Sequence, residues 1–269
     1  MARTRVRFAP LVALAALSGA VPLLAGCGSG DSPGPENAGA GGHKPVVVAT
    51  TTWEGAFAKA AGAEDVTVIV PPSVHHAPDY DPKPSDLAAV AKADFVLYAP
   101  FEPYAAKIKE AAGSKARLVE VNLDNEPARA GAEVARLGGL FGTEDAAERW
   151  KTRLDGEVAK LNGELESAWP GGRSPVVVTQ VFTAWAADLA GATTVGTYGP
   201  EPVTPSRLAS LSAKRPAYVL DNAHMSTGTV LPDSGARQVR IANYPGEDLD
   251  LLAVYRAAAA ELRKAMAGA

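Results

Sequence analysis

The stretch "VVVATTTWEGAFAKAAG" (Val46 to Gly62) returns in altered form as "VVVTQVFTAWAADLAG" (Val176 to Gly191). Each copy has a run of valines, a short polar segment with a tryptophan, and a run of small residues that ends in glycine. The valines predict a buried strand, and the small residues before glycine predict a helix. Because internal repeats indicate repeated architecture, the two copies predict two similar halves.

The repeat continues beyond these two stretches. "PSDLAAVAKADFVLY" (Pro84 to Tyr98) matches "PSRLASLSAKRPAYVLD" (Pro205 to Asp221), apart from a two-residue insertion. In both, the serine after proline is expected to cap a helix, and a run of β-forming residues follows the helical segment.

Further strands are expected in each half. "VTVIVPP" from Val66 and "TTVGTYGPEP" from Thr193 predict strands that end in proline-rich loops. "RLVEVNL" (Arg117 to Leu123) and "QVRIANY" (Gln238 to Tyr244) predict a fourth strand in each half. Strands that alternate with helices and read as apolar runs imply parallel sheets buried on both faces. We therefore expect an α/β fold with two β/α lobes, each with a roughly four-stranded parallel sheet.

One long amphipathic helix is expected between the halves, over residues 143–169. Its apolar residues recur at steps of four, four, three and four: Trp150, Leu154, Val158, Leu161 and Leu165. Such a helix would be about 40 Å long and would join the lobes as a packed strut that holds them nearly fixed. We expect the first lobe over residues 44–142 and the second over residues 174–269.

The N-terminus predicts export. "MARTRVRF" is basic, and the apolar run after it reaches the chain's one cysteine, Cys27. "LAGC" is typical of the lipobox of bacterial lipoproteins, so residues 1–26 are expected to be a signal peptide and Cys27 a lipid attachment site. The alternatives are a buried thiol or a transmembrane helix, but the run is short for a span and contains glycine and proline. A single cysteine leaves neither a disulfide framework nor a cysteine-based zinc site.

Residues 27–43 have the composition of a flexible tether, rich in glycine, proline and small polar residues. Removing residues 1–26 removes three arginines and no acidic residue, which leaves 23 basic residues against 30 acidic ones. An acidic body argues against nucleic acid as a partner and suits a cationic ligand.

Two of the four histidines stand side by side in "VPPSVHHAPDYDPKPSD" (Val70 to Asp86). Imidazole is a common metal ligand, so His75 and His76 are candidate ligands. The plain alternative is a pair of solvated loop histidines. The aspartates around them are typical of turns and helix starts.

The lipobox, the two lobes joined by a long helix, and the pattern "PP…H…DYDPKPSDL…KADFVLY" together resemble the metal-binding solute-binding proteins of zinc and manganese ABC importers. The resemblance implies a metal in the cleft between the lobes, at the carboxyl ends of the strands. It also implies one ligand histidine in the loop before "DYDPKPSD". His75 and His76 both lie there; we favour His76.

The chain departs from that family at two positions. The segment leading to the linker helix, "LDNEPARAG", has no histidine, and Gln180 stands where histidine or glutamate is common. The repeat suggests replacements, because Tyr98 and Asp221 are equivalent strand ends, and the loops after them carry Glu102 and His224. We therefore predict a metal site formed by His76 or His75 with Glu102, Asp221 and His224. Nitrogen and carboxylate ligands suit zinc. Manganese becomes a better fit as the share of carboxylates among the ligands rises.

Simpler roles are open for two of these residues. A salt bridge to Lys107 or Lys109 would explain Glu102 equally well, and His224 could cap a helix or form an ordinary hydrogen bond. The tryptophans at 53 and 185 occupy corresponding positions in the repeat and are expected to pack in the core; the alternative is that they line the cleft.

Motifs of common enzymes are absent: the sequence has no G-x-S-x-G, no H-E-x-x-H and no P-loop. We expect no catalysis and no organic cofactor. The predicted protein is a monomeric, extracytoplasmic lipoprotein that captures zinc or manganese and delivers it to an ABC permease in the membrane. The alternatives are the same fold binding another solute, such as a chelated metal or small organic molecule, and a ligand-free adhesin or scaffold.

Overall fold

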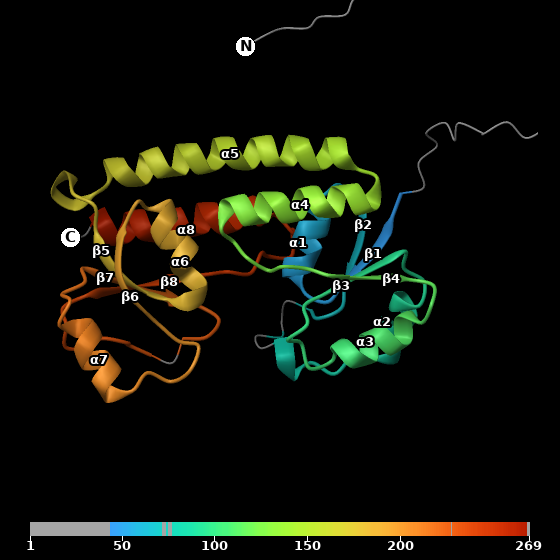
Figure 1. Cartoon of the computed structure of the whole chain (residues 1–269), viewed down its shortest axis with the longest axis horizontal. Coiled ribbons are helices and arrows are strands. Elements are labelled where there is room, and N and C mark those ends of the chain that lie inside the picture. The colour runs from blue at the N-terminus through green and yellow to red at the C-terminus, as the bar shows by residue number, and fades with distance from the viewer. Residues whose placement is uncertain (1–43, 72–73, 75–76, 227, 268–269) are drawn as a thin grey trace, which may run out of the picture. The chain divides into compact units, whose positions relative to one another are not determined.

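The computed structural model describes residues 44–71, 74, 77–226 and 228–267. Two four-stranded sheets form its framework, and every pairing in them is parallel (Figure 1). The first sheet consists of β1 (Val46–Ala49), β2 (Asp65–Val68), β3 (Phe95–Tyr98) and β4 (Arg117–Glu120). The second consists of β5 (Val176–Gln180), β6 (Thr193–Tyr198), β7 (Tyr218–Asn222) and β8 (Arg237–Ile241). Their orders, β2-β1-β3-β4 and β6-β5-β7-β8, are the same, which confirms the predicted repeat.

Helices follow the strands in a similar order in both lobes. The first lobe has α1 (Thr52–Ala60), α2 (Pro84–Val90) and α3 (Ala105–Ala112), with the short η1 (Ala77–Asp79) before α2. The second has η3 (Val181–Thr183), α6 (Ala184–Leu189), α7 (Pro205–Ser212) and α8 (Leu251–Ala267). The described part of the β7–β8 connection forms turns and bends, whereas α3 occupies the equivalent connection in the first lobe.

The predicted serine caps are wrong in both lobes. Helix α2 begins at Pro84 and is preceded by Lys83 as N-cap, and α7 begins at Pro205. The cap of α7 is Thr204, whose hydroxyl accepts a hydrogen bond from Arg207 N at 3.3 Å. Proline fills the first helical position because it has no N–H to satisfy there, so the cap is the residue before it.

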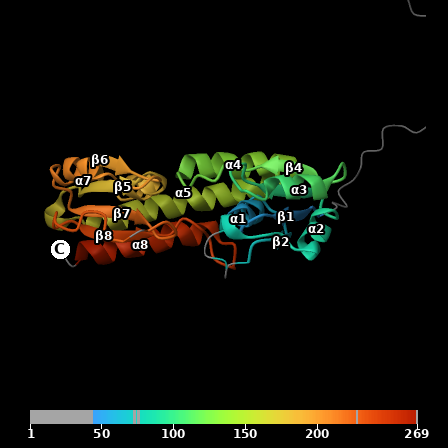
Figure 2. The same ribbon diagram turned by 90° about the horizontal axis from the view of Figure 1, so that it is seen from below.

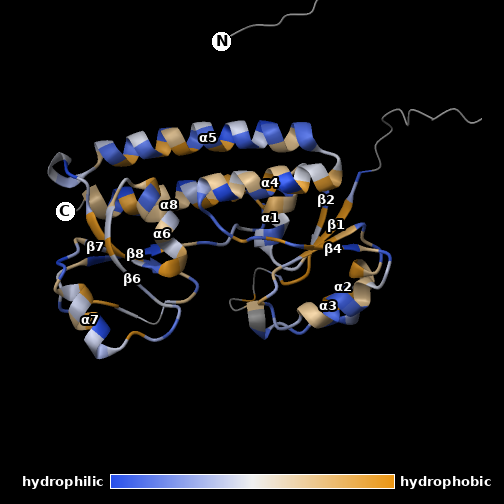
Figure 3. Ribbon diagram, in the orientation of Figure 1, coloured by the Kyte–Doolittle hydropathy of each residue, from blue (hydrophilic) through white to orange (hydrophobic). Residues whose placement is uncertain are grey.

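Along the chain, β4 is followed by α4 (Pro127–Phe141), which packs on α1 of the first lobe, and then by α5 (Glu144–Ser167) and the short η2 (Pro170–Gly172). Helix α5 is the predicted linker; at 24 residues it is about 36 Å long. The predicted apolar residues face the core, with Val158 partly buried and the other four buried. Figure 3 shows the result as alternating hydrophobic and hydrophilic bands along α5. Since α5 contacts α1 and α4 as well as α6 and α8, it packs on both lobes.

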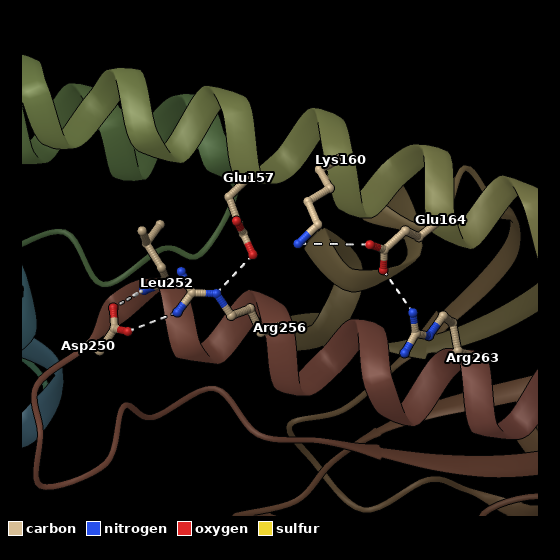
Figure 4. Close-up of polar contacts among 7 residues, drawn as sticks. All are labelled: Glu157, Lys160, Glu164, Asp250, Leu252, Arg256 and Arg263. Carbon is tan, nitrogen blue, oxygen red and sulfur yellow. Dashed lines mark hydrogen bonds and ion pairs between the residues drawn. The ribbon is translucent and has the colours of Figure 1, made fainter.

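Helices α5 and α8 run side by side (Figure 2) and are linked by two ion pairs. Arg256 binds Glu157 and Arg263 binds Glu164, each at 2.8 Å (Figure 4). From the first pair to the second, the residue number rises by seven on both helices, which is the spacing of a heptad. The two helices therefore run in the same direction. The arginines are about half exposed, so each pair contributes only a fraction of a kcal/mol.

Candidate metal site

The loops that follow β2, β1 and β3 begin next to one another, because these strands are neighbours in a parallel sheet. Val70 N donates to Thr50 O at 2.9 Å, and Thr50 N donates to Leu97 O at 3.0 Å. Thr50 therefore lies at the centre of the carboxyl edge of the first sheet, where open α/β sheets bind ligands. His75 and His76 belong to the loop after β2 but lie outside the described residues.

Glu102 lies buried in the loop after β3. Its carboxylate accepts a hydrogen bond from Ala99 N at 3.1 Å and another from the Tyr104 hydroxyl at 3.1 Å. The alternative of a lysine salt bridge is wrong for both candidates: Lys107 pairs with Asp81, and Lys109 lies over the ring of Tyr98, 4.5 Å from its centroid. Glu102 is thus held inside the lobe by neutral donors.

A second buried carboxylate, that of Glu54, lies near Glu102. Glu54 is the third residue of α1 and is fully buried. One of its oxygens, Oε2, accepts hydrogen bonds from Thr51 N at 3.1 Å and from the Thr51 hydroxyl, completing a capping box. The hydroxyl of Thr50 lies close to both Glu54 and Glu102, and its interaction with each carboxylate lowers the pKa of that acid.

Burial controls the ionisation of both acids. It raises the pKa of Glu54 above its usual range. Burial, followed by repulsion from the Glu54 carboxylate, raises the pKa of Glu102 to about 8, although hydrogen bonds from Ala99, Thr50 and Tyr104 oppose the rise. Ionising both carboxylates at once therefore costs free energy, and a nearby cation would reduce that cost.

The second lobe reaches this region through Tyr244. Its ring centroid lies 4.9 Å from that of Trp53 and 4.7 Å from that of His224. Burial raises the pKa of Tyr244, and the charges of Glu54 and Glu102 raise it further, which indicates that the phenol is near both acids.

Asp221 is engaged elsewhere in the second lobe. Its Oδ1 accepts a hydrogen bond from the Tyr198 hydroxyl at 2.7 Å, and its Oδ2 accepts one from Gln238 Nε2 at 2.9 Å. Gln180, at the end of β5, also uses its side chain locally, because its Oε1 accepts from Phe182 N at 2.7 Å. Both residues are buried and form contacts within their own lobe.

Two tryptophans and two asparagines form a network where the lobes meet. Trp53 Nε1 donates to Asn125 Oδ1 at 3.0 Å, and Trp185 Nε1 donates to Asn243 Oδ1 at 2.9 Å. Asn125 Nδ2 then donates to Asn243 O at 3.0 Å, which crosses from one lobe to the other. Asn125 belongs to the segment in which the family pattern suggested a histidine. Here the segment supplies an amide that binds the lobes together.

The described residues contain no group of three His, Cys, Asp or Glu side chains arranged to hold a metal ion. Of the predicted ligands, Glu102 is buried in the first lobe, the ring of His224 packs against that of Tyr244, and Asp221 accepts hydrogen bonds from Tyr198 and Gln238. Sequence reasoning missed Glu54. The signal that could have found it was the pattern Thr51-x-x-Glu54, which predicts a capping box but does not reveal a neighbouring acid.

Comparisons with known proteins support the resemblance. Residues 47–137 match the family model ZnuA, described as zinc-uptake complex component A, periplasmic. No curated protein sequence matches the chain significantly. None of the helices in the described ranges is both long and apolar enough to cross a membrane.

Solved structures share the fold. The laminin-binding protein Lmb of Streptococcus agalactiae, described as bifunctional with adhesin and metal transporting activity, is 17% identical, with 81% of this chain and 99% of that chain covered and a TM-score of 0.60. The nickel complex of FpvC from P. aeruginosa is 15% identical, with coverages of 84% and 98% and a TM-score of 0.61. A zinc-bound variant of AdcAII from Streptococcus pneumoniae is 17% identical, with coverages of 81% and 98% and a TM-score of 0.58. The predicted resemblance is thus confirmed: this chain has the fold of the metal-binding solute-binding proteins, and its first lobe matches the zinc-uptake family.

Proposed function

We propose that the protein is an extracytoplasmic solute-binding lipoprotein that captures zinc or manganese and delivers it to an ABC permease. The match of residues 47–137 to a zinc-uptake family supports the class of function. The observation that carries the proposal is the buried carboxylate of Glu102, which lies in the loop after β3 at the carboxyl edge of the first sheet and is held there by Ala99 N and the Tyr104 hydroxyl. A cation bound at this edge would offset the cost of burying negative charge.

The proposed ligands are His76 or His75, Glu102, His224 and Asp221. Imidazole nitrogen and carboxylate oxygen suit zinc and manganese, which bind here as transported cargo. Asp221 would have to exchange its hydrogen bonds from Tyr198 and Gln238 for the metal, so we expect it to contribute least.

The remaining parts of the proposal follow from the same family resemblance. Cys27 would carry the lipid that anchors the protein to the outer face of the cell membrane, and residues 27–43 would tether the folded body. The protein would act as a monomer, without catalysis and without an organic cofactor.

Two observations favour other candidates. Lmb, which shares the fold, is described as an adhesin as well as a metal transporter, which favours an adhesin. The lack of a three-ligand group among the described residues favours a chelated metal or a small organic solute, for which the protein need supply fewer ligands.

Metal content and binding test the proposal. Protein purified without chelators should contain about one zinc or manganese per chain by elemental analysis, and calorimetry with each ion should give a matching stoichiometry. Changing His75, His76 and His224 together to alanine should abolish binding, whereas His43→Ala, in the tether, should leave it unchanged. Wild-type protein that neither carries nor binds either ion would contradict the proposal.

A further inference from the structure

We propose that the outer edge of β8 is a docking site for an extended acidic segment of a partner protein, which would add to the second sheet as a further strand. Strand β8 ends the order β6-β5-β7-β8 and pairs on one side, with β7. An unpaired strand edge is a ready template for another strand. The inference does not depend on the proposed metal site, because it concerns the edge of a sheet and not the ends of its strands.

The backbone groups of β8 point alternately toward β7 and toward the outer edge. Arg237 N donates to Ala217 O at 2.9 Å, and Ala223 N donates to Ile241 O at 2.9 Å, so the odd-numbered residues of β8 bond to β7. In a parallel ladder, the residues between them direct their N–H and C=O groups to the other side. These residues are Gln238 and Arg240, and both line a cavity of about 530 Å³.

This cavity follows the strand for four consecutive residues, 237–240, and has a wall on each face of the sheet. On one face, Gln238 Nε2 donates to Gly228 O at 2.8 Å, which holds the end of the β7–β8 connection beside the strand. On the opposite face, Val239 packs in the main core cluster with Ala265 of α8, which forms the other wall. Such a trough along a strand edge has room for an extended backbone.

The charges that line the cavity select the partner. Arg240 lies on the same face of β8 as Gln238, and Lys264 comes from α8 on the other face, so each wall carries an exposed cation. Neither side chain forms an ion pair with a described residue. Arg237 and Glu261 also line the cavity, which leaves it positive although the chain has more acidic than basic residues. These cations attract an acidic segment and repel the same edge of a second copy.

Two other edge strands are covered by arginines of neighbouring helices. Arg136 of α4 donates to Glu120 O of β4 at 2.8 Å, and Arg207 of α7 donates to Thr197 O of β6 at 2.7 Å. In the part of the chain that the structure describes, no side chain donates to the carbonyls of Gln238 and Arg240. The outer edge of β8 therefore keeps its acceptors available to a partner.

A synthetic peptide tests the docking site. The probe is a labelled peptide of alternating threonine and valine with two adjacent glutamates at its centre. Adjacent residues of a strand point to opposite faces, so the two glutamates would reach Arg240 and Lys264 separately. We expect the protein to bind this peptide in fluorescence anisotropy, and to bind the matching dilysine peptide about tenfold more weakly or less. Absence of binding, or equal binding of both peptides, would overturn the proposal.

Charge reversal locates the binding site. A variant with Arg240→Glu and Lys264→Glu should prefer the dilysine peptide, which reverses the order found for the wild type. The matched control combines Arg149→Glu and Arg153→Glu on the exposed face of α5, which changes the net charge equally. It should keep the preference for the diglutamate peptide. If both variants lost that preference to the same extent, net charge and not the edge of β8 would be responsible.

Two measurements on the wild type test the strand pairing itself. Replacing the threonines of the probe by proline removes N–H groups that a strand needs, so binding should be lost. With the unmodified probe at saturation, the amides of Gln238 and Arg240 should exchange with solvent about tenfold more slowly, whereas that of Leu118 in β4 should not change. Binding that survives proline, or that inorganic phosphate displaces with no change in amide exchange, would indicate an anion site without strand addition and refute the proposal.

Discussion

At the scale of single residues, the chemistry of this protein depends on where its acids are placed. Glu102 is held by Ala99 and Tyr104, Glu54 by Thr51, and none of these partners is a lysine or arginine. Asp221 lies at the end of the equivalent strand in the second lobe but is satisfied by Tyr198 and Gln238. The two lobes have therefore diverged: one keeps a buried acid pair that a cation could compensate, and the other uses its acid in internal hydrogen bonds.

The raised pKa of Glu102 predicts how stability depends on pH. The folded state holds this proton up to about pH 8, whereas the unfolded chain releases it near pH 4.5. The contribution to stability is thus fully present below about pH 4.5 and is lost as the pH rises through about 8. We expect the free energy of unfolding of the metal-free protein, measured in urea with a chelator present, to fall by a few kcal/mol across this range.

Two variants test whether burial of Glu102 causes this decline in stability. Glu102→Gln should make the decline smaller and be more stable than the wild type at about pH 8.5, while Glu54, whose pKa is also raised, still contributes to the decline. Glu110→Gln, on the exposed face of α3, should keep the wild-type pH dependence. If Glu102→Gln and the wild type declined equally, burial of Glu102 would not be the reason.

At the scale of elements, close packing of helices decides what the linker can tolerate. Helices α4 and α5 meet at Gly138, where an added Cβ would lie 2.6 Å from Ala147 Cβ. Gly139, the next residue, has open space at the same position. This contact lets α4 and α5 pack as a pair against the first lobe, and it depends on one residue having no side chain.

The neighbouring glycines make a matched test of that contact. Gly138→Ala should destabilise the protein by about 1 to 3 kcal/mol, because the extra methyl overpacks the contact and outweighs the gain in helix propensity. Gly139→Ala should stabilise it by up to about 1 kcal/mol, since alanine favours the helix and meets nothing. Urea unfolding of both variants measures the difference; equal effects would show that α4 and α5 do not pack closely at this point.

At the scale of the whole folded body, one core joins the lobes. The main hydrophobic cluster contains Val47 of β1 and Val177 of β5 together with Leu154 of α5. The hydrogen bond from Asn125 to Asn243 also crosses between the lobes, and α5 packs on helices of both. Such continuity favours nearly fixed lobes, with ligand exchange through local loop movement instead of wide closure.

Shared packing predicts that the lobes unfold together. Leu154→Ala, at a fully buried site, should cost about 2 to 5 kcal/mol and lower the midpoint of a single transition. Circular dichroism and tryptophan fluorescence should report the same midpoint, because tryptophans stand in both lobes and on the linker. Two separated transitions, with only one shifted by the substitution, would mean that the lobes are independent.

The two lobes, their parallel strands and the linker helix could be predicted from the sequence, because valine runs, proline-led helices and the repeat from Val46 to Val176 are local signals. It also pointed to Glu102, through its place after a strand. Helices α4 and α8 lie outside the repeat, so the repeat did not predict them. Which polar groups meet could not be predicted from the sequence. Glu54 resembles an ordinary capping residue, yet its charge raises the pKa of Glu102 in the loop after another strand. Asn125 resembles a loop residue, yet it donates a hydrogen bond to Asn243 of the other lobe. The reason is physical: periodicity depends on neighbours along the chain, whereas burial, repulsion and hydrogen-bond pairing depend on neighbours in space.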